Sequence, residues 1–403
     1  MGKGSKLHLL GNVATAQHLI YRYTLDKVFI EAGAWTTNDI EISEDCYIRI
    51  LIRYSNDKTI TEAIKSELVN NEIFIRIAPQ IVTNKVYEYT LNERVVPSYF
   101  REQLESALTK AEANMIDVGI DGETFIFLSD LHWEDNSKNS PILVETIANK
   151  LPINTAVLCG DYFNGGAYAP MIELLQDCAN QFSKSIKKPV FLFGNHDSNE
   201  LSPNTGVEVD PFVKAEFYAV MQKYSEDNVT YGAYNYFYFD NHATRTRYIC
   251  LDTLMYGDGL HPEQQMWFET TLNTMLDGYR ALVFAHIIYP AKTTPPSESN
   301  PWTLTSFMNT ICEMCDTFNT NNTNGNEVIA LFGGHCHIDA NLTTTGGIPI
   351  ILIDCDARKT GSAVGHAVGT INEQCLDVVT IDYKNRNIKC VRVGRGSDRT
   401  ITY

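Results

Sequence analysis

The sequence carries little positive charge for its length. Lys and Arg number 32 against 49 Asp and Glu in 403 residues, which gives a formal net charge of −17. The phosphate backbone of nucleic acids is bound by clustered Lys and Arg side chains, so a strongly acidic chain is poorly suited to it. The composition therefore argues against general binding along a nucleic-acid backbone.

Long apolar runs are also absent. The longest candidate, residues 281–291, contains a histidine and a proline, and it falls short of the roughly 18 apolar residues of a membrane span. The N-terminal residues Met-Gly-Lys-Gly-Ser-Lys lack the apolar core of a signal peptide. We therefore expect synthesis in a cytoplasm and no association with a membrane. A protein that is assembled into a particle could leave the cytoplasm without a signal.

Cysteine usage does not indicate a disulfide framework. The 10 cysteines are spread over the whole chain, whereas secreted disulfide scaffolds are short and cysteine-dense. We interpret Cys159, Cys250, Cys355 and Cys390, which lie in or beside apolar runs, as small core residues. The chain is 44% hydrophobic, enough for a sizeable core, and its length predicts two to three domains.

Residues 1–95 are predicted to form a small all-β module. Residues 46–54 place isoleucines on one side of a strand and arginines on the other, and residues 71–77 repeat this alternation. Attachment or oligomerisation are the functions that we consider for this module, because it carries no cluster of chemically active residues.

Residues 96–118 are predicted to form an amphipathic connecting helix. Its apolar residues recur at steps of three and four, at Phe100, Leu104, Leu108, Ala111 and Met115. Two interpretations are open: the stripe packs on its own domain, or it self-associates around a symmetry axis.

Residues 119–403 have an α/β pattern, in which short apolar strands alternate with helical stretches. Strands are predicted at 124–128, 156–158, 190–193, 281–284, 328–332 and 348–353, and residues 369–394 are predicted to close the chain as a hairpin. The asparagine-rich residues 319–326 are predicted to form an exposed loop.

Five of these strands end in residues that bind metals. The residues concerned are Asp130 and His132, Asp161, Asn195, His286, and His335 and His337. Ligands of α/β sheets bind at the carboxyl ends of the strands, so these loops can converge on one site. Two divalent cations need a shared anionic bridge and several further ligands, and carboxylates, imidazoles and an amide suit Mn, Fe, Ni or Zn better than Ca.

These motifs, taken in order, resemble those of the calcineurin-like metallophosphoesterases. They are Asp-x-His, Gly-Asp-x-x-Asn, Gly-Asn-His-Asp, a strand-end His and Gly-His-x-His. The resemblance covers about residues 119–403 and implies a metallophosphoesterase-type β-sandwich flanked by helices, with a centre of two divalent metal ions that hydrolyses a phosphate ester.

The resemblance also implies a role for each motif residue. Asp130, His132 and His337 would hold the first metal, and Asn195, His286 and His335 the second, with Asp161 as the bridge. A metal-bridged hydroxide would attack a phosphodiester or phosphomonoester. His196 would act at the leaving oxygen and Asp197 would support its loop. The remaining histidines, at positions 8, 18, 242, 261 and 366, have no such context and are interpreted as ordinary residues.

One departure from the family pattern limits the substrate. Many members carry a carboxylate, often followed by Arg, where this chain has Asn164-Gly165-Gly166. In protein phosphatases the carboxylate supports the catalytic histidine and the Arg grips the phosphate. A protein phosphatase is therefore not expected, and an amide would take over as the partner of His196.

The ends of the chain look like those of metallophosphoesterases encoded by phages and prophages of gut bacteria. The all-β module, the helix before Asp130 and the closing hairpin carry this resemblance. It implies an enzyme on a phage tail that acts on a surface phospho-polymer, with a homo-oligomer and phage particle proteins as its partners. The alternatives are a structural or receptor-binding particle protein with little turnover, and a metal-dependent nuclease.

Overall fold

The computed structural model describes most of residues 95–403 and six strands in the N-terminal part. In the first range it leaves out 119–120, 135, 165–167, most of 199–229, 233–235, 254–259, 289–305 and 357–365. The chain divides into two compact units, which are described separately. The first contains Met1–Asn84 with Gly119–Asp121 and His242–Thr244, and the second contains Lys85–Val118, Gly122–Asn241 and Arg245–Tyr403.

The described part of the first unit consists of two three-stranded antiparallel sheets. One has the order β4 (Ile40–Glu41), β1 (Lys6–Leu10), β6 (Phe74–Ile77), and the other β3 (Phe29–Ala32), β2 (Ala16–Tyr23), β5 (Tyr47–Tyr54). Strand β5 coincides with the alternating segment 46–54, as its period of two predicts.

Two mixed sheets form the centre of the second unit. The six-stranded sheet has the order β19 (Arg399–Thr402), β18 (Asn387–Gly394), β17 (Cys375–Asp382), β7 (Gly122–Leu128), β8 (Thr155–Leu158), β9 (Lys188–Phe191). The seven-stranded sheet has the order β10 (Thr230–Tyr231), β11 (Phe237–Asn241), β12 (Thr246–Leu251), β13 (Arg280–Ala285), β14 (Glu327–Gly333), β16 (Pro349–Leu352), β15 (Ala340–Thr343).

Strand direction explains where the chemistry lies. In the first sheet β7, β8 and β9 run parallel, and in the second β12, β13, β14 and β16 run parallel. All six strands predicted in the α/β segment are present, although β9 ends at Phe191 and the closing hairpin continues into a third strand, β19. The parallel strands present their carboxyl ends together, which is where ligand sites form in such sheets.

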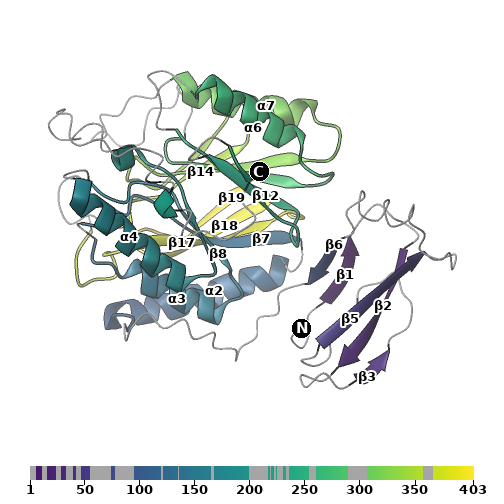
Figure 1. The fold of residues 1–403 in the computed structure, drawn as a ribbon. Coiled ribbons are helices and arrows are strands. Elements are labelled where there is room, and N and C mark those ends of the chain that lie inside the picture. The colour runs from purple at the N-terminus through teal and green to yellow at the C-terminus, as the bar shows by residue number, and fades with distance from the viewer. Residues whose placement is uncertain are drawn as a thin grey trace. The chain divides into compact units, whose positions relative to one another are not determined.

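Helices cover the outer faces of the two sheets (Figure 1). Helices α2 (Arg101–Val118), α3 (Ser140–Lys150) and α4 (Tyr168–Ser185) share an apolar cluster with the six-stranded sheet, and α6 (Pro262–Asn273) and α7 (Ser306–Asn321) share one with the seven-stranded sheet. Short 3-10 turns occur at η1 (Ser98–Phe100) and η2 (Asn195–Ser198). The predicted α/β architecture, in which helices flank a β-sandwich, is confirmed for this unit.

Aromatic side chains fill the space between the two sheets. Phe125 of β7 contacts Tyr248, Phe284 and Phe332 of the opposite sheet edge-on, with ring centroids 5.4–5.7 Å apart. Phe284 and Phe332 stack with centroids 5.1 Å apart. Each such ring buries a large apolar area, and the pairs add about 0.5–1.5 kcal/mol beyond that burial. This packing fixes the two sets of strand ends against one another.

The amphipathic helix packs on its own unit. Leu104, Ala107 and Ala111 of α2 are buried in the cluster that also contains α3 and α4, and Leu108 and Met115 pack against it. The apolar stripe is thus used within the chain, whether or not α2 also takes part in self-association. Among the described residues, no helix is long and apolar enough to span a membrane.

One predicted loop is partly helical. Helix α7 runs to Asn321, so the loop prediction is wrong for residues 319–321. The Asn319 side chain both donates to the carbonyl of Val328 (2.9 Å) and accepts from its N–H (2.7 Å). These bonds to β14 hold an asparagine in the last turn of a helix despite its low helix propensity.

Candidate metal centre

The loops after β7, β8, β9, β13 and β14 bring the predicted site residues together. Four side chains form one cluster, Asp130, His132, Asp161 and His337, whose ligand atoms lie within 4.8 Å of one another. Asp161, His286 and His335 form a second cluster by the same measure. Because Asp161 belongs to both, the structure contains two adjacent potential cation sites that share one carboxylate.

The first cluster is buried and closely packed. The Nε2 atom of His337 lies 3.2 Å from Nε2 of His132 and 3.2 Å from Oδ1 of Asp130. Oδ1 of Asp130 is buried, and the ring nitrogens of His337 and, at 3.8 Å, of His286 lie nearest to it. Two ring nitrogens that approach each other this closely need a proton or a cation between them, so this arrangement fits a metal.

The second cluster includes the predicted amide ligand. Asn195 Oδ1 lies 3.0 Å from Nε2 of His286 and 2.7 Å from Nδ1 of His335. Nε2 of His286 is also 3.1 Å from Oδ2 of Asp161. The other ring nitrogen of His286 contacts the carbonyl of Cys159 at 2.5 Å. A backbone carbonyl on the far side of the ring is the usual partner of a metal-binding histidine, because it directs the opposite nitrogen at the ion.

Backbone strain concentrates in these loops. Among the described non-glycine residues, eight have a positive φ, and five of them are site residues: Asp130 (54°), His132 (40°), Asp161 (55°), His335 (66°) and His337 (53°). A left-handed conformation of this kind costs roughly 1–3 kcal/mol per residue and persists where the surrounding structure enforces it, often at functional sites. Here it occurs at five of the residues whose side chains meet in the two clusters.

Two glycines allow the loops to approach. A Cβ at Gly194 would overlap the backbone nitrogen and a carboxylate oxygen of Asp161, and a Cβ at Gly334 would overlap Ser129 Oγ and Asp130 Oδ2. Asp130 Oδ2 also accepts a hydrogen bond from the N–H of His335 at 2.9 Å. The glycines are therefore required by contact between loops.

Burial and neighbouring charges perturb the titration of the cluster. Burial, together with neighbouring histidines, lowers the pKa of His132 and of His335 to about 3, which leaves neutral imidazoles that can bind metals. Burial by itself also lowers the pKa of His286, but the carboxylates of Asp161 and Asp130 raise it to about 10. Without a metal, the two carboxylates thus draw a proton onto His286, as expected where a cation belongs.

His196 lies at the edge of the centre and is held by backbone groups. Its backbone N–H donates to the side-chain Oδ1 of Asp161 (2.8 Å), and its ring Nδ1 contacts the backbone carbonyl of Asn164 (3.3 Å). The expectation of a side-chain amide as its partner is therefore wrong: the main chain supplies the acceptor. Its Nε2 lies 3.8 Å from Asp161 Oδ2, so this edge of the ring is turned toward the clusters.

Asp197 binds backbone N–H groups. Its carboxylate accepts hydrogen bonds from Gly194 (2.7 Å), Asp161 (2.9 Å) and Tyr162 (2.8 Å). Burial and the charge of Asp161 raise the pKa of Asp197 well above its ordinary value. The contacts connect the loops after β8 and β9, which agrees with a supporting position.

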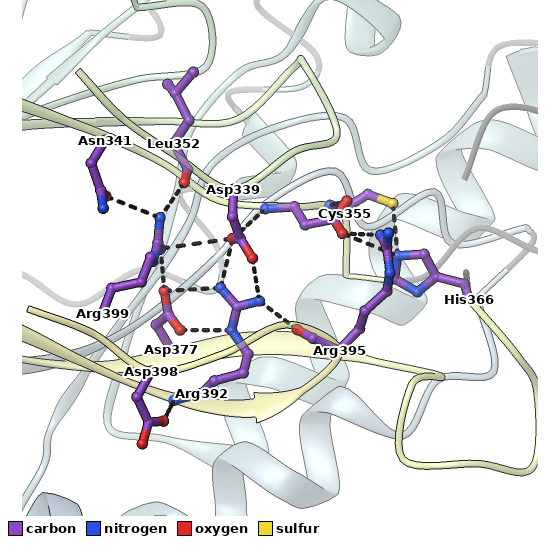
Figure 2. Close-up of polar contacts among 11 residues, drawn as sticks. Asp339, Asn341, Leu352, Cys355, His366, Asp377, Arg392, Arg395, Asp398 and Arg399 are labelled. Atoms are coloured by element: carbon purple, nitrogen blue, oxygen red, sulfur yellow. Dashed lines mark hydrogen bonds and ion pairs between the residues drawn. The ribbon is translucent and has the colours of Figure 1, made fainter. Parts of the chain in front are cut away.

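A buried ion network, which the sequence analysis missed, holds the loop after β14 (Figure 2). Arg392 donates from Nη1 and Nη2 to the two carboxylate oxygens of Asp339, at 2.9 and 2.7 Å, and from Nε to Asp377 at 2.8 Å. Arg399 donates to Asp377 at 2.6 Å and to the carbonyl of Leu352 at 2.7 Å. Asp339 follows His337 by two residues, so the network ties the metal loop to β17, β18 and β19.

A signal for this network exists in the sequence. Asp377 and Arg392 each have an apolar residue directly before and after them in their strand, and they are paired directly across β17 and β18. Opposite charges in such a cross-strand pair attract. Their partner Asp339, from the loop between β14 and β15, could not be identified without the fold.

The comparisons agree with this geometry. A sequence profile described as "Calcineurin-like phosphoesterase" matches residues 123–339, which is more than half of the chain. The chain belongs to the calcineurin-like phosphoesterase family. The predicted family is thus confirmed, and with it the general class of a metal-dependent phosphoesterase. The assignment of each side chain to a particular metal stays a prediction.

Solved structures similar to the chain include a dimetal phosphatase from zebrafish (Danio rerio), at 15% identity, 70% coverage of this chain, 98% coverage of that chain and a TM-score of 0.45. A purple acid phosphatase from yellow lupin (Lupinus luteus) is 9% identical, with a TM-score of 0.46, and the match covers 100% of this chain and 73% of that chain. A phosphopantetheinyl hydrolase from Mycobacterium tuberculosis is 13% identical, with a TM-score of 0.33, and the match covers 59% of this chain and 91% of that chain. No curated protein sequence matches the chain.

Proposed function

We propose that the chain is a dinuclear metal-dependent phosphodiesterase. The observation that carries the proposal is the pair of ligand clusters that share Asp161. The first ion would be held by Asp130, His132 and His337, and the second by Asn195, His286 and His335. When bound, the two ions would act as Lewis acids that activate water and stabilise charge on the phosphoryl oxygens.

The side chains around the ions would divide the remaining work. The Nδ1–H of His196 donates to a backbone carbonyl, and this orients Nε2 toward the clusters. In the doubly protonated form of the ring, Nε2–H would donate to the leaving oxygen. Asp197 would be a positioning residue, because it connects Gly194, Asp161 and Tyr162 through their N–H groups.

A diester is the favoured substrate on grounds of charge. A phosphomonoester is a dianion near neutral pH, whereas a diester carries one negative charge. After Asn164 the chain has Gly165 and Gly166, at the point where the protein phosphatases of this family carry an Arg that grips the phosphate. The net charge of −17 disfavours any polyanion, which counts against a processive nuclease acting on DNA and equally against a polyanionic surface polymer.

The first test is hydrolysis of a chromogenic phosphodiester and of its monoester by metal-stripped protein. Mn, Ni, Zn or Mg is added back singly, and each of these ions accepts this type of ligand set to some extent. We expect metal-restored turnover with the diester preferred, near-complete loss in Asp161→Asn, and a smaller loss in His196→Gln. Full activity in Asp161→Asn would overturn the assignment of the bridge.

The N-terminal unit supports a second, separate proposal. It lies outside the segment matched by the family profile, and its described part is all strand. We infer that it attaches the enzyme to a phage particle, where a surface phospho-polymer would be the substrate. Purified wall polymer should then be hydrolysed faster than DNA, RNA or cyclic nucleotides. The competing hypothesis is a structural or receptor-binding particle protein with little turnover. It predicts metal binding without hydrolysis of any of these esters.

A further inference from the structure

Three potential metal ligands gather outside the dinuclear clusters, beyond the end of β16. Asp354 and Cys355 follow this strand closely, and His366 lies 11 residues after Cys355. Their ligand atoms lie within 4.8 Å of one another, and none of the three belongs to either dinuclear cluster. Figure 2 shows Cys355 and His366 with their polar contacts beside the Arg392 network.

The distances within this group are close to those of a tetrahedral site. Cys355 Sγ lies 3.4 Å from His366 Nε2, and the same nitrogen lies 3.8 Å from Asp354 Oδ2. A tetrahedral zinc ion with bonds of about 2.0 Å to nitrogen and oxygen and 2.3 Å to sulfur separates its ligand atoms by about 3.3–3.6 Å. The two separations that involve His366 are therefore within a few tenths of an ångström of those in a tetrahedral site, and the sulfur and the carboxylate lie within 4.8 Å of each other.

The three side chains are withdrawn from solvent. The exposed fraction is 4% for the His366 side chain and 6% for that of Asp354, and Cys355 is fully buried. The Nδ1 atom of His366 is buried without a hydrogen-bond partner in the described part of the chain. Among the described residues, the polar interactions of the ring are those of Nε2, with the sulfur and the carboxylate.

This arrangement differs from a catalytic cysteine–histidine pair. In such a pair the thiol contacts one ring nitrogen and a third group orients the other, and the sulfur is accessible to substrate. Here the sulfur of Cys355 and the carboxylate of Asp354 approach the same nitrogen of His366, and the sulfur is buried. Convergence of three unlike ligand atoms is the arrangement that a shared cation requires.

The carboxylate is already oriented for this role. Asp354 Oδ1 accepts the N–H of Cys355 at 2.9 Å, and Oδ2 forms an ion pair with Arg395. Carboxylates that bind metals are themselves usually held by such hydrogen bonds. Arg395 would remain on the carboxylate as its outer partner when an ion is bound.

We propose that Asp354, Cys355 and His366 bind a single divalent cation of borderline softness, of the zinc and cobalt class, separately from the dinuclear centre. The thiolate, the imidazole and the carboxylate suit such an ion. On binding, the Cys355 thiol loses its proton to solvent, and the dipositive ion balances the thiolate and carboxylate charges. The ion would fix His366 against the end of β16. Sequence reasoning had interpreted His366 as an ordinary residue and Cys355 as a small core residue.

Cobalt titration of the full-length, metal-stripped chain tests this site directly. A thiolate ligand gives Co²⁺ an intense charge-transfer absorption in the near ultraviolet, which ligands of the dinuclear centre, nitrogen and oxygen atoms, do not produce. We expect the band in the native chain and its loss in Cys355→Ser and His366→Gln, with one fewer Co²⁺ bound per chain. Asp161→Asn should keep the band, because it alters only the dinuclear centre.

Cys336 provides the matched control, since it is also buried and lies between His335 and His337. Cys336→Ser should retain the band. A native chain without the band, or a band that is lost in Cys336→Ser and kept in Cys355→Ser, would overturn the proposal. X-ray absorption of the zinc-loaded native chain needs no variant: a zinc–sulfur distance near the usual 2.3 Å supports the site, and its absence refutes it.

Discussion

Replacement of Arg392 by Met should loosen the metal loop from the C-terminal strands. The guanidinium has five N–H groups, and all five have acceptors: two oxygens of Asp339, two of Asp377 and the carbonyl of Arg395. The Arg392 side chain is 1% exposed and that of Asp377 is fully buried. Met fills a similar volume but leaves these acceptors without their donor.

The magnitude follows from the burial of the partners. Removal of one member of a buried ion pair costs about 3–5 kcal/mol, because the remaining charge is left uncompensated. Asp377 keeps its bond to Arg399, and the Asp339 side chain is 26% exposed. The low end, about 3 kcal/mol, therefore applies. For a unit of this size it corresponds to a decrease in Tm of about 4–5 °C.

The assay is calorimetry of the metal-free chain combined with metal titration. Because Asp339 follows His337 by two residues, we expect Arg392→Met also to weaken metal binding, by about 10-fold, as is typical for the outer support of a metal site. Arg386→Met is the matched control: Arg386 forms a fork with Glu327 and its side chain is 49% exposed. Exposed pairs of this kind contribute only about 0–1 kcal/mol.

Two results would refute the reasoning. Equal Tm values for Arg392→Met and Arg386→Met would mean that the buried network contributes no more than an exposed ion pair. A lower Tm with unchanged metal affinity would mean that the network stabilises the strands without positioning the loop of His337.

The same network and one glycine yield two further predictions. Burial raises the pKa of Asp377, but Arg392 and Arg399 outweigh burial and lower this pKa below its ordinary value. The ionised carboxylate therefore contributes its full stabilisation above the unfolded-state pKa of about 3.9. This stabilisation is lost as the pH falls through the lower pKa of the folded state. Urea unfolding between pH 6 and pH 3 should show this loss, and Arg392→Met should reduce it; an identical pH dependence would contradict the assignment. Gly334→Ala should lower metal affinity at least 10-fold, because the added Cβ would displace Asp130. Gly325→Ala is the control: its Cβ would meet no atom within 4 Å, so metal affinity should not change. Metal titration of both variants tests this.

The position of the site could be predicted because its residues follow strands directly. Short apolar runs predict β7, β8, β13 and β14, and polar residues after the carboxyl ends of parallel strands meet at one edge. Strand ends are local features, and the residues after them, such as Asp161 and His286, are fixed by a few neighbouring positions. The grouping into two clusters around Asp161 then follows from the order of the motifs, which is information carried by the resemblance to the family.

Other features depend on contacts between distant segments and could not be predicted. The left-handed backbone at Asp130 and His132 is enforced by the neighbouring loop, since their N–H groups donate to the carbonyls of Gly160 and Asp161. Nothing in the residue types announces it, because Asp and His adopt such conformations only occasionally. The carbonyl that faces His196 was missed for a similar reason: a backbone acceptor has no signature in the sequence.

The strands after the family match are part of the catalytic unit in a physical sense. The match ends at Asp339, yet β17 pairs with β7 along its length, from Asp377 opposite Phe127 to Asp382 opposite Gly122. Strand β7 leads directly to Asp130, and Arg392 on β18 holds Asp339. Both ends of the first ligand cluster are therefore supported by residues that the family pattern does not include. Strands β17 and β18 thus support the loops of Asp130 and His337. Changes in these closing strands should therefore affect the metal centre, although in the described contacts none of their residues touches a metal ligand.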